Sequence, residues 1–66
     1  MTVYNTKRGT VINLDNVEKV TNIEVERGFE IIFSFVSGKY HSMFFADKEE
    51  CRQEYIEILR IMNKED

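Results

Sequence analysis

The stretch that decides the fold is residues 29–45, FEIIFSFVSGKYHSMFF, in which two apolar runs flank a Ser-Gly pair. The first run is rich in aromatic and β-branched side chains and the second in aromatic ones, and both types favour strands. A short connection that contains glycine, between two such runs, is typical of a β-hairpin. The stretch therefore predicts antiparallel strands over residues 29–36 and 39–45.

The length of this hairpin loop decides which side chains share a sheet face. A two-residue turn at Ser37-Gly38 pairs Phe33 with Ser42, and alternate residues then point to opposite faces. We expect one face to form the core, with Phe29, Ile31, Phe33, Phe35, Tyr40 and Phe44. The opposite face then carries Ile32, Val36, His41, Met43 and Phe45.

The other two glycines of the chain mark two earlier turns. Strand-like residues 2–6 and 10–14 flank Lys7-Arg8-Gly9, a three-residue loop in which glycine fits the left-handed last position. Residues 20–25 form the next predicted strand, and Glu26-Arg27-Gly28 repeats this pattern. A three-residue loop there pairs Val25 with Phe29, whereas a two-residue Arg27-Gly28 turn pairs Val25 with Glu30. We favour the longer loop because apolar side chains then meet.

Residues 47–63 show the features of one amphipathic helix. Asp47 is placed to cap its first backbone amides, and Glu50 follows three residues later as in a capping box. An apolar stripe at helical spacing comprises Cys51, Tyr55, Ile58, Leu59 and Met62. The predicted fold is a single α+β domain over residues 1–66: an antiparallel β-meander of four to five strands with one C-terminal helix packed on one face.

Composition limits the classes of function. The 66 residues carry a net charge of −3, which disfavours nonspecific nucleic-acid binding. No apolar run is long enough to cross a membrane, and no signal-peptide segment is evident. One cysteine and one histidine allow neither an internal disulfide nor a four-ligand zinc site. We therefore expect a cytoplasmic protein with no metal, no cofactor and no membrane partner.

A small domain without such staples often depends on association. The predicted second apolar face suits that role, so the interface candidates are Ile32, Val36, His41, Met43 and Phe45. The alternative is that the sheet curls and buries this face within the monomer. We favour binding to a second copy or to another protein, such as a host protein.

A second candidate surface is basic. The hairpin tips and the helix start bring together five cations that could hold a phosphate, a nucleotide or a nucleic acid: Lys7, Arg8, Arg27, Lys48 and Arg52. Acidic neighbours such as Glu26 and Glu49 oppose this alternative. An enzyme is not expected, because His41 and Cys51 belong to different surfaces and no metal-binding or phosphate-loop spacing occurs.

The run TKRGTVINLDNV at residues 6–17 resembles the opening of small uncharacterised proteins of Gram-positive bacteria and their phages, which begin T-x-x-G-x-x-I-N-L-x-N-V. The layout of strands and acidic helix that follows is distantly similar to flagellar FlbD-type proteins, which usually have shorter strands. The resemblance implies a β-meander plus helix and a phage or prophage setting, and it transfers no site residues. The resulting hypothesis is a non-catalytic protein-interaction module, homodimeric and of regulatory or inhibitory type.

Overall fold

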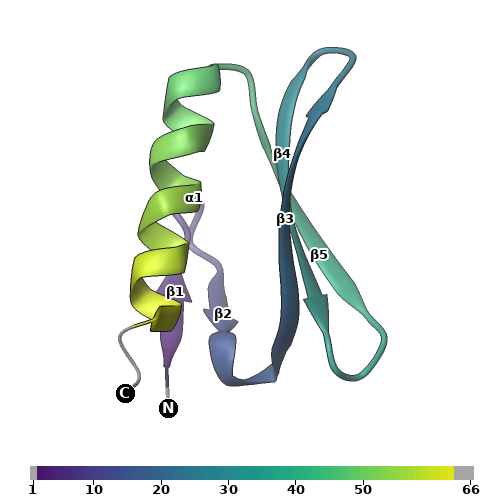
Figure 1. The fold of residues 1–66 in the computed structure, drawn as a ribbon, viewed down its shortest axis with the longest axis vertical. Helices are drawn as coiled ribbons and strands as arrows, with labels where there is room; N and C mark the ends of the chain where they lie inside the picture. Colours follow the sequence, from purple (N-terminus) through teal and green to yellow (C-terminus); the bar gives the residue numbers. More distant parts are fainter. Residues whose placement is uncertain (1, 64–66) are drawn as a thin grey trace.

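The computed structural model describes residues 2–63, which form two antiparallel sheets and one helix. In chain order the elements are β1 (Val3–Asn5), β2 (Val11–Asn13), a 3-10 turn η1 (Leu14–Asn16), β3 (Val17–Val25), β4 (Gly28–Phe35), β5 (Tyr40–Phe45) and α1 (Lys48–Asn63). Strands β1 and β2 pair with each other, and β3, β4 and β5 form a second sheet in that order. Figure 1 shows α1 and the β1–β2 hairpin on the same side of the three-stranded sheet. The predicted α+β class is confirmed, with the strands divided between two sheets.

The β1–β2 hairpin has the predicted register. Tyr4 lies opposite Ile12, and the Thr6 amide donates to the Thr10 carbonyl at 2.8 Å. Gly9 closes the three-residue loop with a φ of +89°, a conformation that suits glycine because it has no Cβ. The Thr6 hydroxyl also accepts the amide of Arg8 at 3.2 Å. These bonds hold the short hairpin without help from a third strand.

The β4–β5 connection is one residue longer than predicted. The Phe35 amide donates to the Lys39 carbonyl at 2.8 Å, so the loop is Val36-Ser37-Gly38. Gly38, at φ +93°, takes the same last position that Gly9 takes in the first hairpin. Ile31 therefore lies opposite Met43, and Phe33 lies opposite His41. The predicted register is wrong, and the one-residue shift exchanges the two faces of β5.

The β3–β4 turn is one residue shorter than predicted, because Gly28 belongs to β4. Val25 lies opposite Gly28, and Asn22 lies opposite Ile31. A Cβ on Gly28 would stand 2.5 Å from the Phe45 carbonyl oxygen, so close packing against β5 requires glycine here. The preferred pairing of Val25 with Phe29 is wrong, and the alternative pairing with Glu30 is wrong too. β3 begins at Val17, with a bulge between Val17 and Lys19.

The core lies between the three-stranded sheet and the two elements that cover it. Ile31, Phe33 and Ile58 are fully buried, and Cys51 is 1% exposed. The Tyr4 and Phe33 rings pack with their centroids 6.2 Å apart, which joins the hairpin to the sheet. The buried cluster consists of Tyr4, Ile12, Leu14, Ile31, Phe33, Met43, Phe45, Cys51 and Ile58. Its members come from every strand except β3 and from both helical segments.

The predicted Asp47 cap of α1 is confirmed, and so is the stripe, except that Leu59 is not among the residues packed against the core. An Asp47 carboxylate oxygen accepts the Glu50 amide at 3.0 Å, which satisfies one of the first free amides of the helix. Cys51 and Ile58 are buried at the centre of the stripe, while Tyr55 and Met62 pack partly buried beside them. Within residues 2–63, no helix combines the length and apolar character that crossing a membrane demands.

Candidate interaction surface

The face of the three-stranded sheet that points away from α1 is covered by no element of residues 2–63. Successive side chains of a strand point to opposite faces, so the residues on either side of a buried residue point to this uncovered face. Figure 1 shows the helix and the hairpin on the other side only. We call this surface the open sheet face, and it comprises Lys19, Thr21, Ile23, Val25, Glu30, Ile32, Ser34, Tyr40, Ser42 and Phe44.

Cross-strand pairing arranges the open sheet face in rows. The first row is Lys19, Ser34 and Tyr40, at the end nearest the β4–β5 loop. The middle row is Thr21, Ile32 and Ser42. The third row is Ile23, Glu30 and Phe44, followed by Val25 at the β3–β4 turn. The apolar side chains thus concentrate at the turn end and continue to the centre through Ile32.

Large apolar side chains on this face remain exposed. Tyr40 is 74% exposed, and Ile23 and Phe44 are 36% and 37% exposed. A hollow of about 510 Å³ opens at the turn end, where Val25 and Phe44 form an apolar floor. Glu26, Arg27 and Glu30 border the hollow. The face therefore offers a protruding aromatic side chain at one end and an acidic-rimmed hollow at the other.

Of the residues predicted to form an interface, the structure keeps only Ile32 on the open sheet face. Met43 and Phe45 are 4% and 8% exposed in the core, so their predicted position on the outer face is wrong. His41 shares their side of β5, with its ring 6.4 Å from that of Phe33. Val36 belongs to the β4–β5 loop and is 69% exposed. Tyr40 and Phe44, which were predicted to be in the core, occupy the outer face instead.

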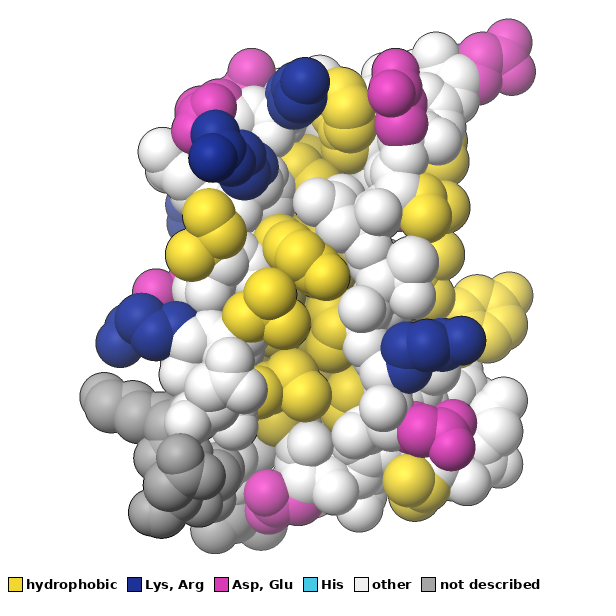
Figure 2. All heavy atoms as spheres, in the orientation of Figure 1, with side chains coloured by type: hydrophobic (Ala, Val, Ile, Leu, Met, Phe, Trp, Pro, Cys, Tyr) yellow, Lys and Arg dark blue, Asp and Glu magenta, His cyan; other side chains and the backbone are white. Residues whose placement is uncertain are grey.

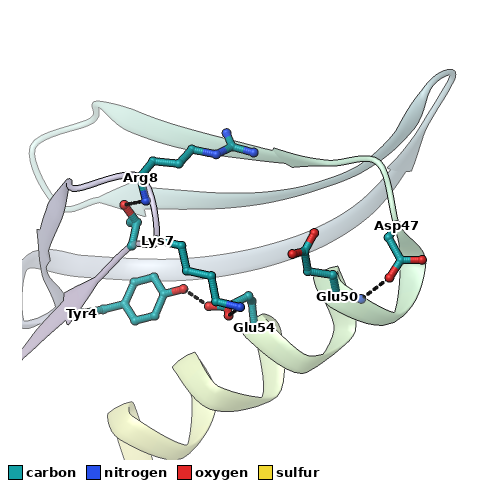
Figure 3. Close-up of polar contacts among 7 residues, drawn as sticks. Tyr4, Lys7, Arg8, Asp47, Glu50 and Glu54 are labelled. Atoms are coloured by element: carbon teal, nitrogen blue, oxygen red, sulfur yellow. Dashed lines mark hydrogen bonds and ion pairs between the residues drawn. The ribbon is translucent and has the colours of Figure 1, made fainter.

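The predicted basic cluster is divided among three places. Lys7 forms an ion pair with Glu54 at 3.1 Å, and Arg8 donates to the Phe44 carbonyl oxygen. The Arg8 guanidinium also lies 5.8 Å from the Phe45 ring centre. Figure 3 shows Lys7 directed to α1 and Arg8 extended along the sheet. Arg27 lines the hollow on the open sheet face, and Lys48 and Arg52 line a separate groove between α1 and β3.

A buried polar contact fastens the first hairpin to α1. The Tyr4 hydroxyl donates to Glu54, whose second oxygen pairs with Lys7 (Figure 3). Burial raises the pKa of Tyr4 above its usual 10.0, and the hydrogen bond and charge of Glu54 raise it further. Tyr4 therefore stays a hydrogen-bond donor at physiological pH. Sequence reasoning missed this contact, because Glu54 fits equally well on a solvated helix face.

The chemically reactive side chains are not arranged together. Burial raises the pKa of the Cys51 thiol, which donates to the Asn22 amide oxygen at 3.4 Å. A buried protonated thiol is a poor nucleophile. His41 packs against Phe33 on the far strand β5. Among residues 2–63 no three side chains of His, Cys, Asp or Glu come together as a metal site.

Comparison with protein-family models, with curated proteins and with solved structures found no match. The resemblance to small proteins of Gram-positive bacteria and phages therefore stays a prediction. The open sheet face must be interpreted from its own residues.

Proposed function

We propose that this chain is a non-catalytic protein-interaction module that forms a homodimer through the open sheet face. The observation that carries the proposal is the exposure of Tyr40, Ile23 and Phe44 on a sheet face that no other element of residues 2–63 covers. A sheet usually buries an apolar face against another element of structure, and an apolar face left uncovered often marks a site of association. A regulatory or inhibitory role, in a phage or prophage setting, is part of the proposal.

The two ends of the face are complementary in shape and charge. Lys19 and Tyr40 stand in the first row, whereas Glu30 and the hollow lie at the opposite end. A two-fold axis through the middle row reverses the strand direction of the second copy. Each Tyr40 then reaches the partner's hollow, and each Lys19 reaches the partner's Glu30. Ile32 lies beside the axis and meets its own copy.

This arrangement stacks two sheets face to face, as in a β-sandwich, with the helices outside. The exposed apolar side chains then become core contacts between copies. Sheets packed in this way lie about 10 Å apart, a spacing that side chains of the size of Tyr40 and Phe44 can fill. The dimer would thus add the core volume that a domain of 66 residues lacks.

Sedimentation velocity at micromolar concentration tests the proposal. We expect a dimer for the wild type and a monomer for Ile32→Glu, because two carboxylates would meet at the axis. Val36→Glu is the matched control: it adds the same charge in a loop outside the face, and we expect it to remain dimeric. A monomeric wild type, or equal dissociation of both variants, would contradict the proposed dimer.

A further inference from the structure

We propose that the groove between α1 and β3 binds an extended segment of another protein as an added strand, with acidic side chains of that segment beside Lys48 and Arg52. The proposal concerns the covered side of the sheet and its β3 edge. It does not depend on the dimer proposed above.

The two edges of the three-stranded sheet differ. At β5, the Phe44 carbonyl oxygen already accepts a hydrogen bond from Arg8 of the first hairpin. At β3, no strand of residues 2–63 pairs on the outer side. β3 has nine residues, and the bulge and charges at Glu18 and Lys19 interrupt only its first part. Residues 20–25 therefore present a regular backbone edge that another strand can extend.

A groove runs beside this edge. A cavity of about 240 Å³ in this groove is lined by Cys51 and Arg52 of α1 and by Asn22 of β3, with Phe29 of β4 also in its lining. The same flank of α1 continues at helical spacing to Tyr55, Leu59 and Met62, all half-buried. Figure 2 shows hydrophobic side chains along the hollow between helix and sheet, with basic side chains at its upper end. An added strand would thus find pockets for alternate apolar side chains.

The charge of the groove indicates which segment fits. Lys48 and Arg52 stand one helical turn apart on its wall. Neither side chain forms a hydrogen bond or an ion pair with any part of residues 2–63. Among the described residues that line the groove, Glu24 is the one carboxylate, so the cations outnumber it. A carboxylate on the bound segment would complement them, while the other flank of α1, with Glu50 and Glu54, would repel it.

Self-pairing of β3 between two copies is unfavourable in the register centred on Thr21. In a two-fold antiparallel pairing of β3 with itself centred on Thr21, Glu18 of one copy meets Glu24 of the other, and like charges directly opposite destabilise a sheet. The bulge after Val17 further limits such self-pairing. The excess of cations in the groove favours a separate acidic and apolar segment in extended conformation as the occupant.

The test uses the monomeric background Ile32→Glu, so that its outcome is separate from that of the dimer. The probe is a synthetic peptide of about six residues, the length of a typical strand, with alternating valine and threonine and a glutamate at one end. It is made with the glutamate at either end and titrated into isotope-labelled protein by NMR. We expect amide shifts at residues 20–25 and at Lys48 and Arg52.

Three comparisons make the test decisive. Lys48→Glu combined with Arg52→Glu should weaken binding by about tenfold or more, whereas Lys39→Glu on the distant loop should not. A peptide that ends in lysine should bind the unaltered groove as weakly as the glutamate peptide binds the double variant. This comparison does not depend on whether the double variant folds. N-methylation of alternate peptide amides should abolish binding of an added strand. Absence of shifts at millimolar peptide, shifts elsewhere, or concentration-dependent β3 shifts without peptide would overturn the proposal.

Discussion

Both faces of the β3–β4–β5 sheet carry large apolar side chains, yet the faces differ in what surrounds them. On the covered face, Ile31 and Phe33 are completely buried beneath α1 and the first hairpin. On the open sheet face, Ile32 is half-buried and Phe44 is 37% exposed. The comparison teaches that apolar content alone does not identify the core of a small sheet. Ile31 stabilises the fold on the covered face, whereas the adjacent Ile32 lies on the face proposed for association.

Two neighbouring isoleucines give the largest expected contrast. Ile31→Ala should lower the free energy of unfolding by about 2–5 kcal/mol, because it leaves a cavity in a closed core. Ile32→Ala should lower it by about 1 kcal/mol or less, because that side chain is only half-buried. Urea denaturation of dilute, monomeric protein measures both. Equal losses would show that the two faces are buried alike.

Two glycines give the next contrast. Gly28→Ala should lower stability by about 1–3 kcal/mol, since its Cβ would overlap the Phe45 carbonyl oxygen and the Phe44 ring. Gly38→Ala meets no atom within 4 Å but must keep a φ of +93°, which costs about 1–2 kcal/mol. Asparagine distinguishes the two causes, because it tolerates left-handed backbone better than alanine. In thermal unfolding, Gly38→Asn should have a higher midpoint temperature than Gly38→Ala. Gly28→Asn should have no higher a midpoint temperature than Gly28→Ala.

The Tyr4–Glu54 hydrogen bond joins the first hairpin to α1 over the covered face, and its contribution to stability should depend on pH. The folded state raises the pKa of Tyr4, so the unfolded chain loses this proton first as the pH rises. Stability should therefore be undiminished below pH 10.0 and fall above it. Tyr4→Phe should cost about 1–2 kcal/mol at neutral pH and show a smaller alkaline loss. Denaturation midpoints between neutral and alkaline pH measure this; identical profiles would contradict the contact.

The smallest expected effect comes from the charges at the two ends of the open sheet face. Lys19→Glu should weaken the dimer by about 0.2–1 kcal/mol through loss of an exposed ion pair with the partner's Glu30. The double variant Lys19→Glu with Glu30→Lys should restore it, because the charges are exchanged. Sedimentation equilibrium at low salt gives the dissociation constants. A double variant weaker than both single variants would argue against the antiparallel arrangement.

The sequence predicted the elements better than it predicted their registers. The first hairpin followed from Gly9, and α1 followed from Asp47 and the stripe that includes Cys51 and Ile58. The register of the second sheet did not follow from the sequence, because residues 29–45 place apolar side chains on both faces. Matching like with like then cannot distinguish a two-residue loop from the three-residue loop that ends at Gly38. Gly28 was predicted to be a turn residue, but glycine is required there because β5 approaches its backbone closely.

The one-residue error in the predicted β4–β5 register explains why the interface candidates on β5 were misplaced. Shifting β5 by one residue moved Met43 and Phe45 into the core and brought Tyr40 and Phe44 outward. The existence of a second apolar face was predictable from the strand composition. Its membership was not, since side-chain direction has a period of two residues. The contacts of Lys7 and Arg8 with α1 and β5 depend on tertiary packing and have no local signature.

Contacts between copies across the open sheet face test the central claim most directly. An isotope-filtered NOE experiment on a mixture of labelled and unlabelled protein detects only signals between the two chains. The account predicts signals from the Tyr40 ring of one copy to the Phe44 ring of the other, and between the two Ile32 side chains. Absence of signals from this face, or signals between copies from Phe29 and Cys51 in the α1–β3 groove, would contradict it.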